Sequence, residues 1–375
     1  MIKNQDIICL SFTDWDREMP SNRYHILTRF AKNNRVFLFE RQIYPLWRDK
    51  HRFFKFLSVR RKDGLYIIEP GFYTPLGFLN GLVYWLYLKI IIARYHIKKP
   101  IFWFYNYRLT SILKLKHVLS CYHCTEIYSE TWRTKKETSR KKVEKIKRQE
   151  KKLAKNVDLI FACSDYLAAK LKKINPATFS TPNAAEYSFY RKAQKPKVNK
   201  FGLEPVLGYC GNIADYKINI PLLIKLSQNF PKCRIVLVGP VIGQSRTMEK
   251  LKKQKNVLFL GKKEVGSLPG IIREFDVCLM PYNTEKWNLF AGQPLKLYEY
   301  IASGKPIVSV NFDCLKDLTD IVYVAKNDQE FIAQVRKALK EKGNNLRLKR
   351  IKIAQQNTWD ERFNLMNDKM EERLK

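Results

Sequence analysis

The sequence of 375 residues lacks the features of fibrous, secreted and membrane-spanning proteins. Its 15 Gly and 16 Pro are too few for a collagen-like or proline-rich polymer. No small-residue cleavage site follows the apolar start MIKNQDIICLSF, so we expect a buried first strand there and a cytoplasmic protein. The best candidate for a membrane span is residues 76–88. This uncharged run is too short to cross about 30 Å of hydrocarbon.

Metal-binding and dinucleotide-binding motifs are also missing. Of the eight cysteines, only Cys121 and Cys124 form a CxxC pair, and no second pair or His cluster completes a zinc site. Most of the others lie in apolar runs, where a reduced thiol behaves as a small buried hydrophobe. No G-x-G-x-x-G fingerprint is present. We therefore expect no structural metal and no bound dinucleotide.

Acidic residues are scarce relative to basic ones. The 35 Asp and Glu face 70 Lys and Arg, and residues 1–200 hold 41 of the basic but only 16 of the acidic residues. Such a balance indicates an anionic partner: a nucleic acid, an acidic membrane surface or a phosphate-bearing ligand. No RNP motif, zinc finger or helix-turn-helix is visible, so we expect no specific nucleic acid. A basic nucleic-acid-binding protein remains the alternative.

Two segments of the first half are compatible with a membrane surface. Residues 133–155 carry twelve basic and three acidic residues. They form either a solvated helix face or a cationic surface beside anionic lipid. Residues 76–95 read as an apolar helix in which Tyr84, Trp85 and Tyr87 are typical of the membrane interface. That helix is either buried in the core or lies in the interface.

The hydrophobic pattern predicts two series of alternating strands and helices, joined by a basic, Pro- and Gly-broken linker at 191–204. This alternation is typical of doubly wound parallel sheets. We therefore predict an α/β protein with two Rossmann-like domains facing a cleft. The expected domains are 1–190, 205–356 and a helical tail, 357–375, that packs back on the first domain. The expected strands are 7–12, 35–40, 65–70, 100–107, 117–124 and 157–164, then 206–212, 233–240, 256–262, 276–282 and 305–310.

The second series holds two candidate phosphate-binding features. Gly208 and Gly211 lie in GYCGN, where a strand ends before a helix. Glycine there lets the backbone approach a phosphate, although many such turns only connect elements. Lys296 and Glu299 are three residues apart at the start of an expected helix. They form either an ordinary surface pair or a site in which Lys296 holds a diphosphate and Glu299 a ribose.

Several segments together resemble the group 1 glycosyltransferases of the GT-B fold. The stretch PLKLYEYIASGKPIVSV (294–310), with GYCGNI and IVLVGP before it, resembles their donor-binding segment. The opening TDWDREMPSNRYHILTRF resembles their first acceptor-side loop and helix. CYHCTEIYSE, VDLIFACSDYL and TPNAAE resemble the end of their N-terminal domain, and NTWDERF their C-terminal tail. These segments follow the family's order along nearly the whole chain.

The resemblance implies roles for individual residues. Glu299 would hold the donor ribose, and Asp16, Arg23 and His25 would lie on the acceptor side. The residues implied around the donor diphosphate are Gly211, Asn212, Lys217, Tyr282, Gln293, Pro294, Leu295 and Lys296. These enzymes generally need no catalytic metal, which agrees with the absence of a DxD motif on an expected loop. Lysines and helix dipoles must then stabilise the leaving nucleoside diphosphate.

Two departures from the family concern stereochemistry and the base. Many retaining members carry a Glu eight positions before the ribose Glu, where this chain has Ala291. Inverting relatives often show an acidic YDxxD-like segment, where this chain has Tyr122–Glu126. An inverting transfer needs a base for the acceptor hydroxyl proton. Glu126 is the preferred candidate, and His123 is the second.

The sequence therefore predicts a metal-independent, inverting glycosyltransferase without a cofactor. Its donor would be a nucleotide-diphosphate sugar (UDP- or GDP-linked), and its acceptor a hydroxyl of a membrane-associated or lipid-linked glycan. We expect the basic first domain to hold it on an anionic membrane surface, at the inner face of the cell membrane, in cell-surface polysaccharide or glycan synthesis. A non-catalytic scaffold of the same fold at a membrane is a further alternative.

Overall fold

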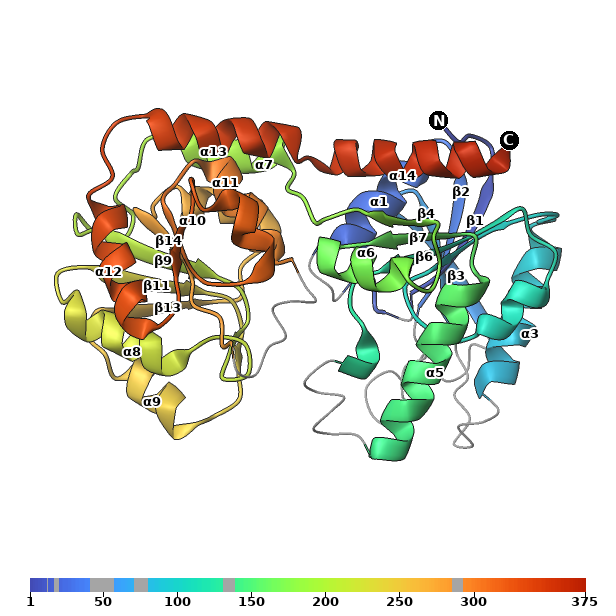
Figure 1. Cartoon of the computed structure of the whole chain (residues 1–375), viewed down its shortest axis with the longest axis horizontal. Helices are drawn as coiled ribbons and strands as arrows, with labels where there is room; N and C mark the ends of the chain where they lie inside the picture. The colour runs from blue at the N-terminus through green and yellow to red at the C-terminus, as the bar shows by residue number, and fades with distance from the viewer. Residues whose placement is uncertain (12, 17–19, 41–56, 71–79, 131–138, 285–292) are drawn as a thin grey trace. The chain divides into compact units, whose positions relative to one another are not determined.

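The computed structural model describes residues 1–11, 13–16, 20–40, 57–70, 80–130, 139–284 and 293–375 (Figure 1). Contacts between residues divide the chain into two units. Unit 1 comprises Met1–Pro182 and Arg362–Lys375, and unit 2 comprises Asn183–Glu361. Within the described ranges, no helix combines the length and the apolar composition that crossing a bilayer requires.

Unit 1 is built around a sheet with the strand order β3-β4-β2-β1-β5-β6-β7-β8. Its neighbouring strands pair in parallel, except that β3 pairs antiparallel with β4 at the edge. The strands are β1 (Asp6–Leu10), β2 (Arg35–Phe39), β3 (Leu57–Lys62), β4 (Leu65–Pro70), β5 (Ile101–Phe104), β6 (Leu119–Cys124), β7 (Leu159–Ala162) and β8 (Thr178–Ser180).

The central strands of this sheet are apolar throughout because helices cover both faces. Every residue of β5, β6 and β7 is buried, as parallel strands between helix layers require. From β1 the chain adds strands on one side as far as β4, then returns to place β5 on the other side of β1. Residues that follow β1, β5 and β6 therefore meet at the carboxyl edge of the sheet near a topological switch point, where ligands bind in such folds.

Five α-helices flank this sheet in the described part of unit 1 or extend into it: α1 (Asn22–Phe30), α3 (Asn80–Arg94), α5 (Arg140–Asn156), α6 (Asp165–Lys172) and α14 (Trp359–Leu374). The last helix ties the end of the chain to its beginning. Asn367 Oδ1 accepts a hydrogen bond from the Ile2 backbone N–H at 2.9 Å. The rings of Phe363 and Phe30 meet edge to face with centroids 4.8 Å apart.

Unit 2 holds a parallel sheet with the strand order β13-β11-β9-β14-β15-β16. A short parallel pair, β10 (Ile213–Ala214) and β12 (Val241–Ile242), lies beside it in sequence. The main strands are β9 (Val206–Cys210), β11 (Arg234–Val238), β13 (Val257–Gly261), β14 (Val277–Met280), β15 (Ile307–Val310) and β16 (Tyr323–Ala325).

Local signals in the sequence set the ends of the unit 2 helices. Asn219 caps α8 by accepting from Leu222 N, and Pro221 lies in its first turn. Gly304 ends α11 in the left-handed conformation, with φ at 71°. The helices are α7 (Tyr187–Tyr190), α8 (Ile220–Asn229), α9 (Arg246–Lys252), α10 (Leu268–Ile272), α11 (Leu295–Ser303), α12 (Asp328–Leu339) and α13 (Asn345–Gln356).

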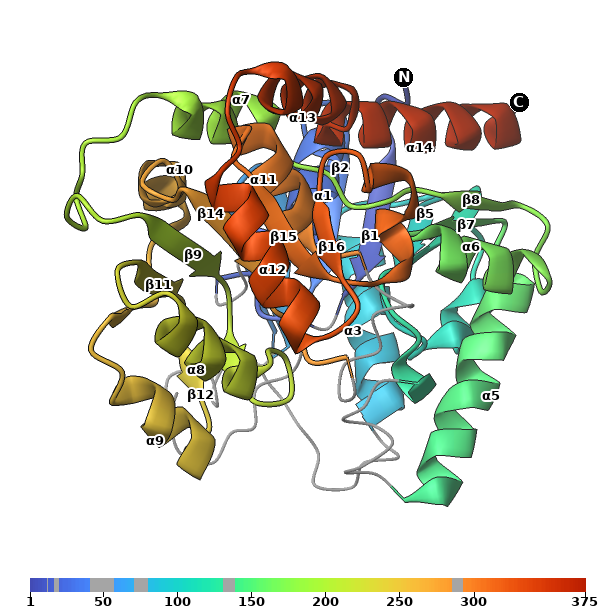
Figure 2. The same cartoon turned by 60° about the vertical axis from the view of Figure 1, so that its left-hand side comes forward.

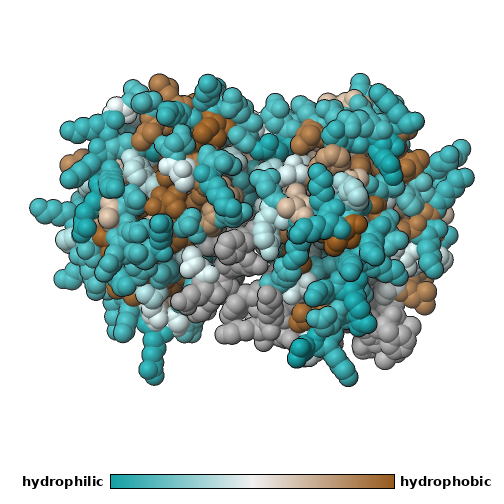
Figure 3. All heavy atoms as spheres, viewed as in Figure 1, coloured by the Kyte–Doolittle hydropathy of each residue, from teal (hydrophilic) through white to brown (hydrophobic). Residues whose placement is uncertain are grey.

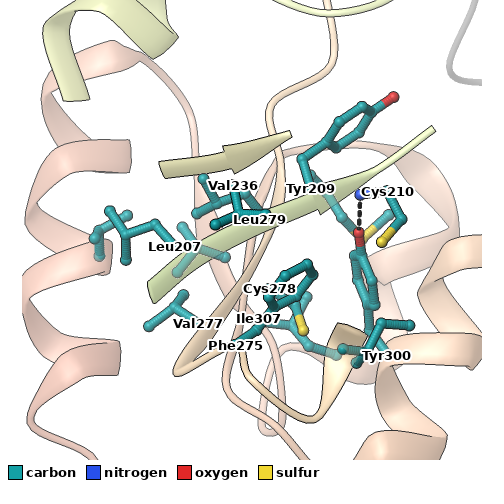
Figure 4. Packing of buried hydrophobic residues seen from close by; sticks show 14 of the residues in the cluster. Leu207, Tyr209, Cys210, Val236, Phe275, Val277, Cys278, Leu279, Tyr300 and Ile307 are labelled. Atoms are coloured by element: carbon teal, nitrogen blue, oxygen red, sulfur yellow. Dashed lines mark hydrogen bonds between the residues drawn. The ribbon is translucent and has the colours of Figure 1, made fainter. Parts of the chain in front are cut away.

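The core of unit 2 is continuous, and it includes part of the expected linker. Figure 4 shows Leu207, Val277 and Ile307 among its packed side chains. Residues 191–204 were expected to be a plain linker, yet Ala193 and Phe201 are buried in this core. Residues 191–194 form a 3-10 turn after α7. The pattern of polar residues hid these two apolar anchors.

Candidate active site

Two glycine turns lie at the carboxyl edge of the unit 2 sheet. Gly211 follows β9 with φ at 150°, and Gly239 follows β11 with φ at 139°. The Gly211 N–H donates to the Val238 carbonyl at 2.7 Å. A Cβ atom at Gly239 would lie 2.0 Å from the Gly211 carbonyl oxygen, so only glycine fits there. The two turns thus bring bare backbone together at the edge of the sheet.

The side chain of Lys296 lies directly beside the first of these turns. A Cβ atom at Gly211 would lie 2.7 Å from Lys296 Nζ and 2.4 Å from its Cε. A second ammonium is near. Burial lowers the pKa of Lys217 to about 8, and the positive charge of Lys296 acts in the same direction. A diphosphate beside these two groups would relieve that repulsion and stabilise both charges.

Helix α11 presents its N-terminus in the same part of unit 2. It begins at Leu295 after Pro294, with no acidic residue in its first turn and no side-chain cap. The Cys210 N–H donates to the Tyr300 hydroxyl at 2.8 Å, which fixes the helix against the end of β9 (Figure 4). The free N–H groups and the positive end of the helix dipole favour an anion here.

Gln293 lies immediately before this helix and is 7% exposed. Its carbonyl accepts from Asn183 Nδ2 at 2.5 Å, and its Nε2 donates to the Tyr298 hydroxyl at 3.3 Å. The Oε1 atom is buried without a hydrogen-bond partner. An orphaned buried acceptor calls for an explanation, and a donor group of a bound ligand would satisfy it.

Glu299 lies one turn into α11 and is hydrogen-bonded to the Tyr190 hydroxyl. Burial raises the Tyr190 pKa, and the Glu299 charge raises it further, so Tyr190 stays a donor. Tyr190 orients the carboxylate that would hold the ribose. We missed Tyr190 in the sequence, because it lies on α7, far from the donor motifs and just inside the expected end of the first domain.

Two other predicted donor residues have clear positions. Tyr282 is 1% exposed, pairs through a β-bridge with Ile218 and packs edge to face on Phe312. It therefore supports the Lys217 segment from within the core. Asn212 is half-buried, and its carbonyl accepts from the Tyr209 hydroxyl at 3.2 Å.

In unit 1, the charge of Arg23 reaches both candidate bases. Glu126 follows β6 and has an exposed side chain, but the protein around it raises its carboxyl pKa, while Arg23 lowers it. Burial, followed by the Arg23 charge, lowers the His123 pKa to about 3. The Arg23 guanidinium lies over the Tyr105 ring, 5.3 Å from its centroid. The structure therefore gathers three predicted residues, Arg23, His123 and Glu126, around Tyr105.

The two candidate bases differ in access to a substrate. His123 is 1% exposed, its Nδ1 lies 3.1 Å from the Tyr105 hydroxyl, and its Nε2 is buried without a partner. A side chain so enclosed, and so costly to protonate, is a poor acceptor of a substrate proton. Glu126 is exposed, with a raised pKa that suits a general base. The geometry favours Glu126.

The remaining acceptor-side predictions fall in a neighbouring group. Asp16 pairs with Lys62 Nζ at 2.5 Å and with Arg60 at 3.0 Å. Arg60 also reaches Glu40 and Glu69. His25 lies on α1, edge to face with Tyr24. We missed Arg60, because its segment LSVRRK, β3, is too polar to be recognised as a strand.

Two expectations about the site have no structural outcome. Ala291, the departure from the retaining pattern, lies outside the described residues. Among the described residues, no three His, Cys, Asp or Glu side chains form a group that could hold a metal. All eight cysteines are free, and all but Cys314 are buried.

Comparisons with known proteins agree with this geometry. Residues 204–341 match the family model of the group 1 glycosyl transferases. A curated relative from Bacillus subtilis (strain 168), the "Putative teichuronic acid biosynthesis glycosyltransferase TuaH", is 27% identical over 211 residues. That alignment covers 53% of this chain and 52% of the relative, so the chain spans about half the length of the curated relative it matches.

Solved structures match almost the whole chain. Sucrose-phosphate synthase from Thermosynechococcus elongatus superposes with a TM-score of 0.71 at 15% identity, over 98% of this chain and 99% of that one. Anabaena Alr3699/HepE, in complex with UDP and glucose, gives 0.70 at 14% identity, over 98% and 100%. WaaG, a glycosyltransferase involved in lipopolysaccharide biosynthesis, gives 0.59 at 14% identity, over 93% and 94%.

Together these findings define the class of protein. The chain has the GT-B fold, with two Rossmann-like α/β units, and the predicted fold class is confirmed. Its second unit carries the group 1 glycosyltransferase domain, and the predicted family resemblance is confirmed as well.

Proposed function

We propose that this protein is a glycosyltransferase that moves a sugar from a nucleotide-diphosphate sugar to a hydroxyl of a membrane-associated or lipid-linked glycan. One observation carries the proposal: the Gly211 turn, the Lys217 and Lys296 ammonium groups and the N-terminus of α11 lie together in unit 2. All of them favour an anion. UDP is the expected nucleotide, because HepE was solved with UDP. The names of TuaH and WaaG support a role in cell-surface glycan synthesis.

In the proposed reaction, Glu126 takes the proton of the acceptor hydroxyl as its oxygen attacks C1 of the donor sugar. The bond from C1 to the diphosphate breaks on the opposite face, so the configuration at C1 inverts. The electron pair leaves with the nucleoside diphosphate, and Lys217, Lys296 and the α11 dipole stabilise its charge. Glu299 holds the ribose hydroxyls. These groups supply positive charge without a metal ion, so we propose a metal-independent transfer.

The test is thermal stabilisation by a nucleotide panel of UDP, GDP, ADP and CMP, with and without EDTA. A ligand that binds only the folded state raises its stability by mass action. We expect one nucleoside diphosphate to raise the melting temperature equally with and without EDTA. Stabilisation that EDTA abolishes would contradict metal independence. No shift with any nucleotide would favour the scaffold or the nucleic-acid alternative.

Substitution of Glu126 tests the base. Glu126→Gln keeps the shape but cannot take a proton, so we expect turnover to fall about 100-fold or more with unchanged stabilisation by UDP. His123→Gln is the companion variant. A larger loss of turnover in His123→Gln, with its melting temperature intact, would transfer the assignment to His123.

A further inference from the structure

The apolar helix α3 has two faces with different fates. Tyr84, Tyr87, Leu88 and Ile91 are buried at helical spacing, so one face is anchored in the unit 1 core. The opposite face carries three large apolar side chains in the open. Leu82, Trp85 and Leu86 are 63%, 37% and 44% exposed. The two expectations for this helix, core or interface, thus apply to its two faces.

Helix α5 of the same unit carries an unusual concentration of positive charge. Glu144 is its one exposed acidic side chain, and no ion pair within the described ranges involves the basic ones. Ile146, Leu153 and Ala154 anchor the opposite face. The exposed basic residues of α5 are Arg140, Lys141, Lys142, Lys145, Lys147, Arg148, Lys151, Lys152 and Lys155.

The start of α5 is an unfavourable place for cations. Its first turn holds Arg140, Lys141 and Lys142 and no acidic residue, and Ser139 makes no side-chain cap. Positive charge at a helix N-terminus opposes the helix dipole and costs stability. The fold therefore concentrates positive charge where it is least welcome, and an external anion is what would offset it.

The two helices point the same way. A helix that connects parallel strands runs antiparallel to them, so α3 and α5 both begin at the carboxyl edge of the sheet, the edge that carries Glu126. Figures 1 and 2 both draw α3 and α5 extending past the same side of the unit 1 sheet. Figure 3 shows hydrophobic atoms over α3 and hydrophilic ones over α5. Within α3, Lys89 Nζ lies 5.0 Å from the Trp85 ring centroid.

We infer that the exposed faces of α3 and α5 form one docking surface for an anionic lipid bilayer. Leu82, Trp85 and Leu86 enter the interface between headgroups and acyl chains, and the α5 cations bind the lipid headgroups. A nucleic acid would use the cations but leave the apolar face of α3 in water, which favours the bilayer. This inference extends the membrane-associated acceptor of the proposed function. It places the bilayer at the same edge of the sheet as the proposed base.

Co-sedimentation of the full chain with vesicles tests the surface. We expect binding to phosphatidylglycerol vesicles, little binding to phosphatidylcholine vesicles, and weakening as salt screens the charges. Equal binding to both lipids, or binding to neither, would overturn the inference.

The apolar contribution is tested by Trp85→Ser combined with Leu86→Ser, which leaves the buried face of α3 untouched. Loss of the inserting side chains should weaken binding to phosphatidylglycerol about tenfold or more. The matched control is Leu203→Ser combined with Leu348→Ser. It removes two side chains of unit 2 that are 87% and 58% exposed, and it should bind like the wild type. Wild-type affinity in the α3 variant would overturn the role of this face.

The electrostatic contribution is tested by reversing three α5 charges with Lys141→Glu, Lys145→Glu and Arg148→Glu. Affinity for phosphatidylglycerol should fall about 100-fold or more. The matched control makes the same change in net charge at exposed lysines of unit 2: Lys250→Glu, Lys253→Glu and Lys255→Glu. An equal loss in the control would show attraction by net charge alone and would overturn a defined surface.

Two further readouts separate the outcomes. Stabilisation by UDP, measured for each variant, reports folding and the donor site independently of lipid. If UDP fails to stabilise the wild type while vesicle binding follows the pattern above, the proposed function fails and the surface stands. Tight binding of single-stranded RNA that depends on α5 but not on α3, without vesicle binding, would overturn the inference in favour of a nucleic acid.

Discussion

At the residue scale, Lys217 combines a predicted role with a property that only the structure reveals. Its pKa is lowered to about 8 by burial and by Lys296, a residue 79 positions away in the sequence. A diphosphate binds the protonated form, so we expect affinity for UDP to fall as the pH rises above about 8. The fall is at most about tenfold per pH unit, since one proton is involved. Isothermal titration between pH 7 and about 10 measures it.

The matched variant for this prediction is Lys217→Arg, which keeps its charge throughout that range. Its affinity for UDP should not change with pH in this window. An identical decline in Lys217→Arg and the wild type would assign the titration to another group. Without ligand the sign reverses. The unfolded chain binds more protons above pH 8, so the Lys217 contribution to the free energy of unfolding rises from pH 8 to 10.5.

At the scale of elements, α5 is a support for the segment that carries the proposed base. Glu150 accepts hydrogen bonds from the backbone N–H groups of Tyr128 and Ser129 at 2.6 and 3.2 Å, and from the Ser129 hydroxyl at 2.5 Å. It is 8% exposed. These bonds hold the turn that follows Glu126 against the helix.

We therefore expect Glu150→Gln to act on turnover through position. Its amide meets N–H donors with one acceptor fewer, which should cost about 1–3 kcal/mol of the free energy of unfolding. Turnover should fall while stabilisation by UDP, bound in unit 2, stays unchanged. Ser129→Ala, which removes one of the three bonds, should show a smaller version of both losses. A stability loss without any change in turnover would make Glu150 purely structural.

The same scale shows what could be predicted from the sequence. Strands such as β5 and β7 are continuous apolar runs because both of their faces are buried, so they were visible in the sequence. The edge strand β3, LSVRRK, has half-exposed and exposed positions, and its polar composition hid it. The proximity of Gly211 to Lys296, like the bond from Tyr190 to Glu299, depends on tertiary packing between distant segments. No local pattern encodes such contacts.

At the scale of the whole molecule, the chain leaves unit 1 at Pro182 and returns to it at Arg362. The returning helix α14 buries Trp359, Phe363, Met366 and Met370. Deletion of the last residues would thus remove part of the unit 1 core, although unit 2 lies between the two segments in the sequence. The segment NTWDERF predicted a helix break near Trp359, because Asn and Thr there favour a cap over a continuous helix. The described helices α13 and α14 meet at that point.

Two substitutions on α14 test its contribution to unit 1. Phe363→Ala removes a ring that is 5% exposed and contacts Phe30, and should cost about 3–5 kcal/mol of the free energy of unfolding. Leu365→Ala, on the same helix but 36% exposed, should cost less than about 1 kcal/mol. Calorimetry with and without UDP then shows which transition moves. Because Phe363 belongs to unit 1 and the proposed UDP site to unit 2, the transition that UDP raises should keep its response in both variants. Loss of UDP stabilisation in Phe363→Ala alone would mean that unit 2 does not fold independently of α14.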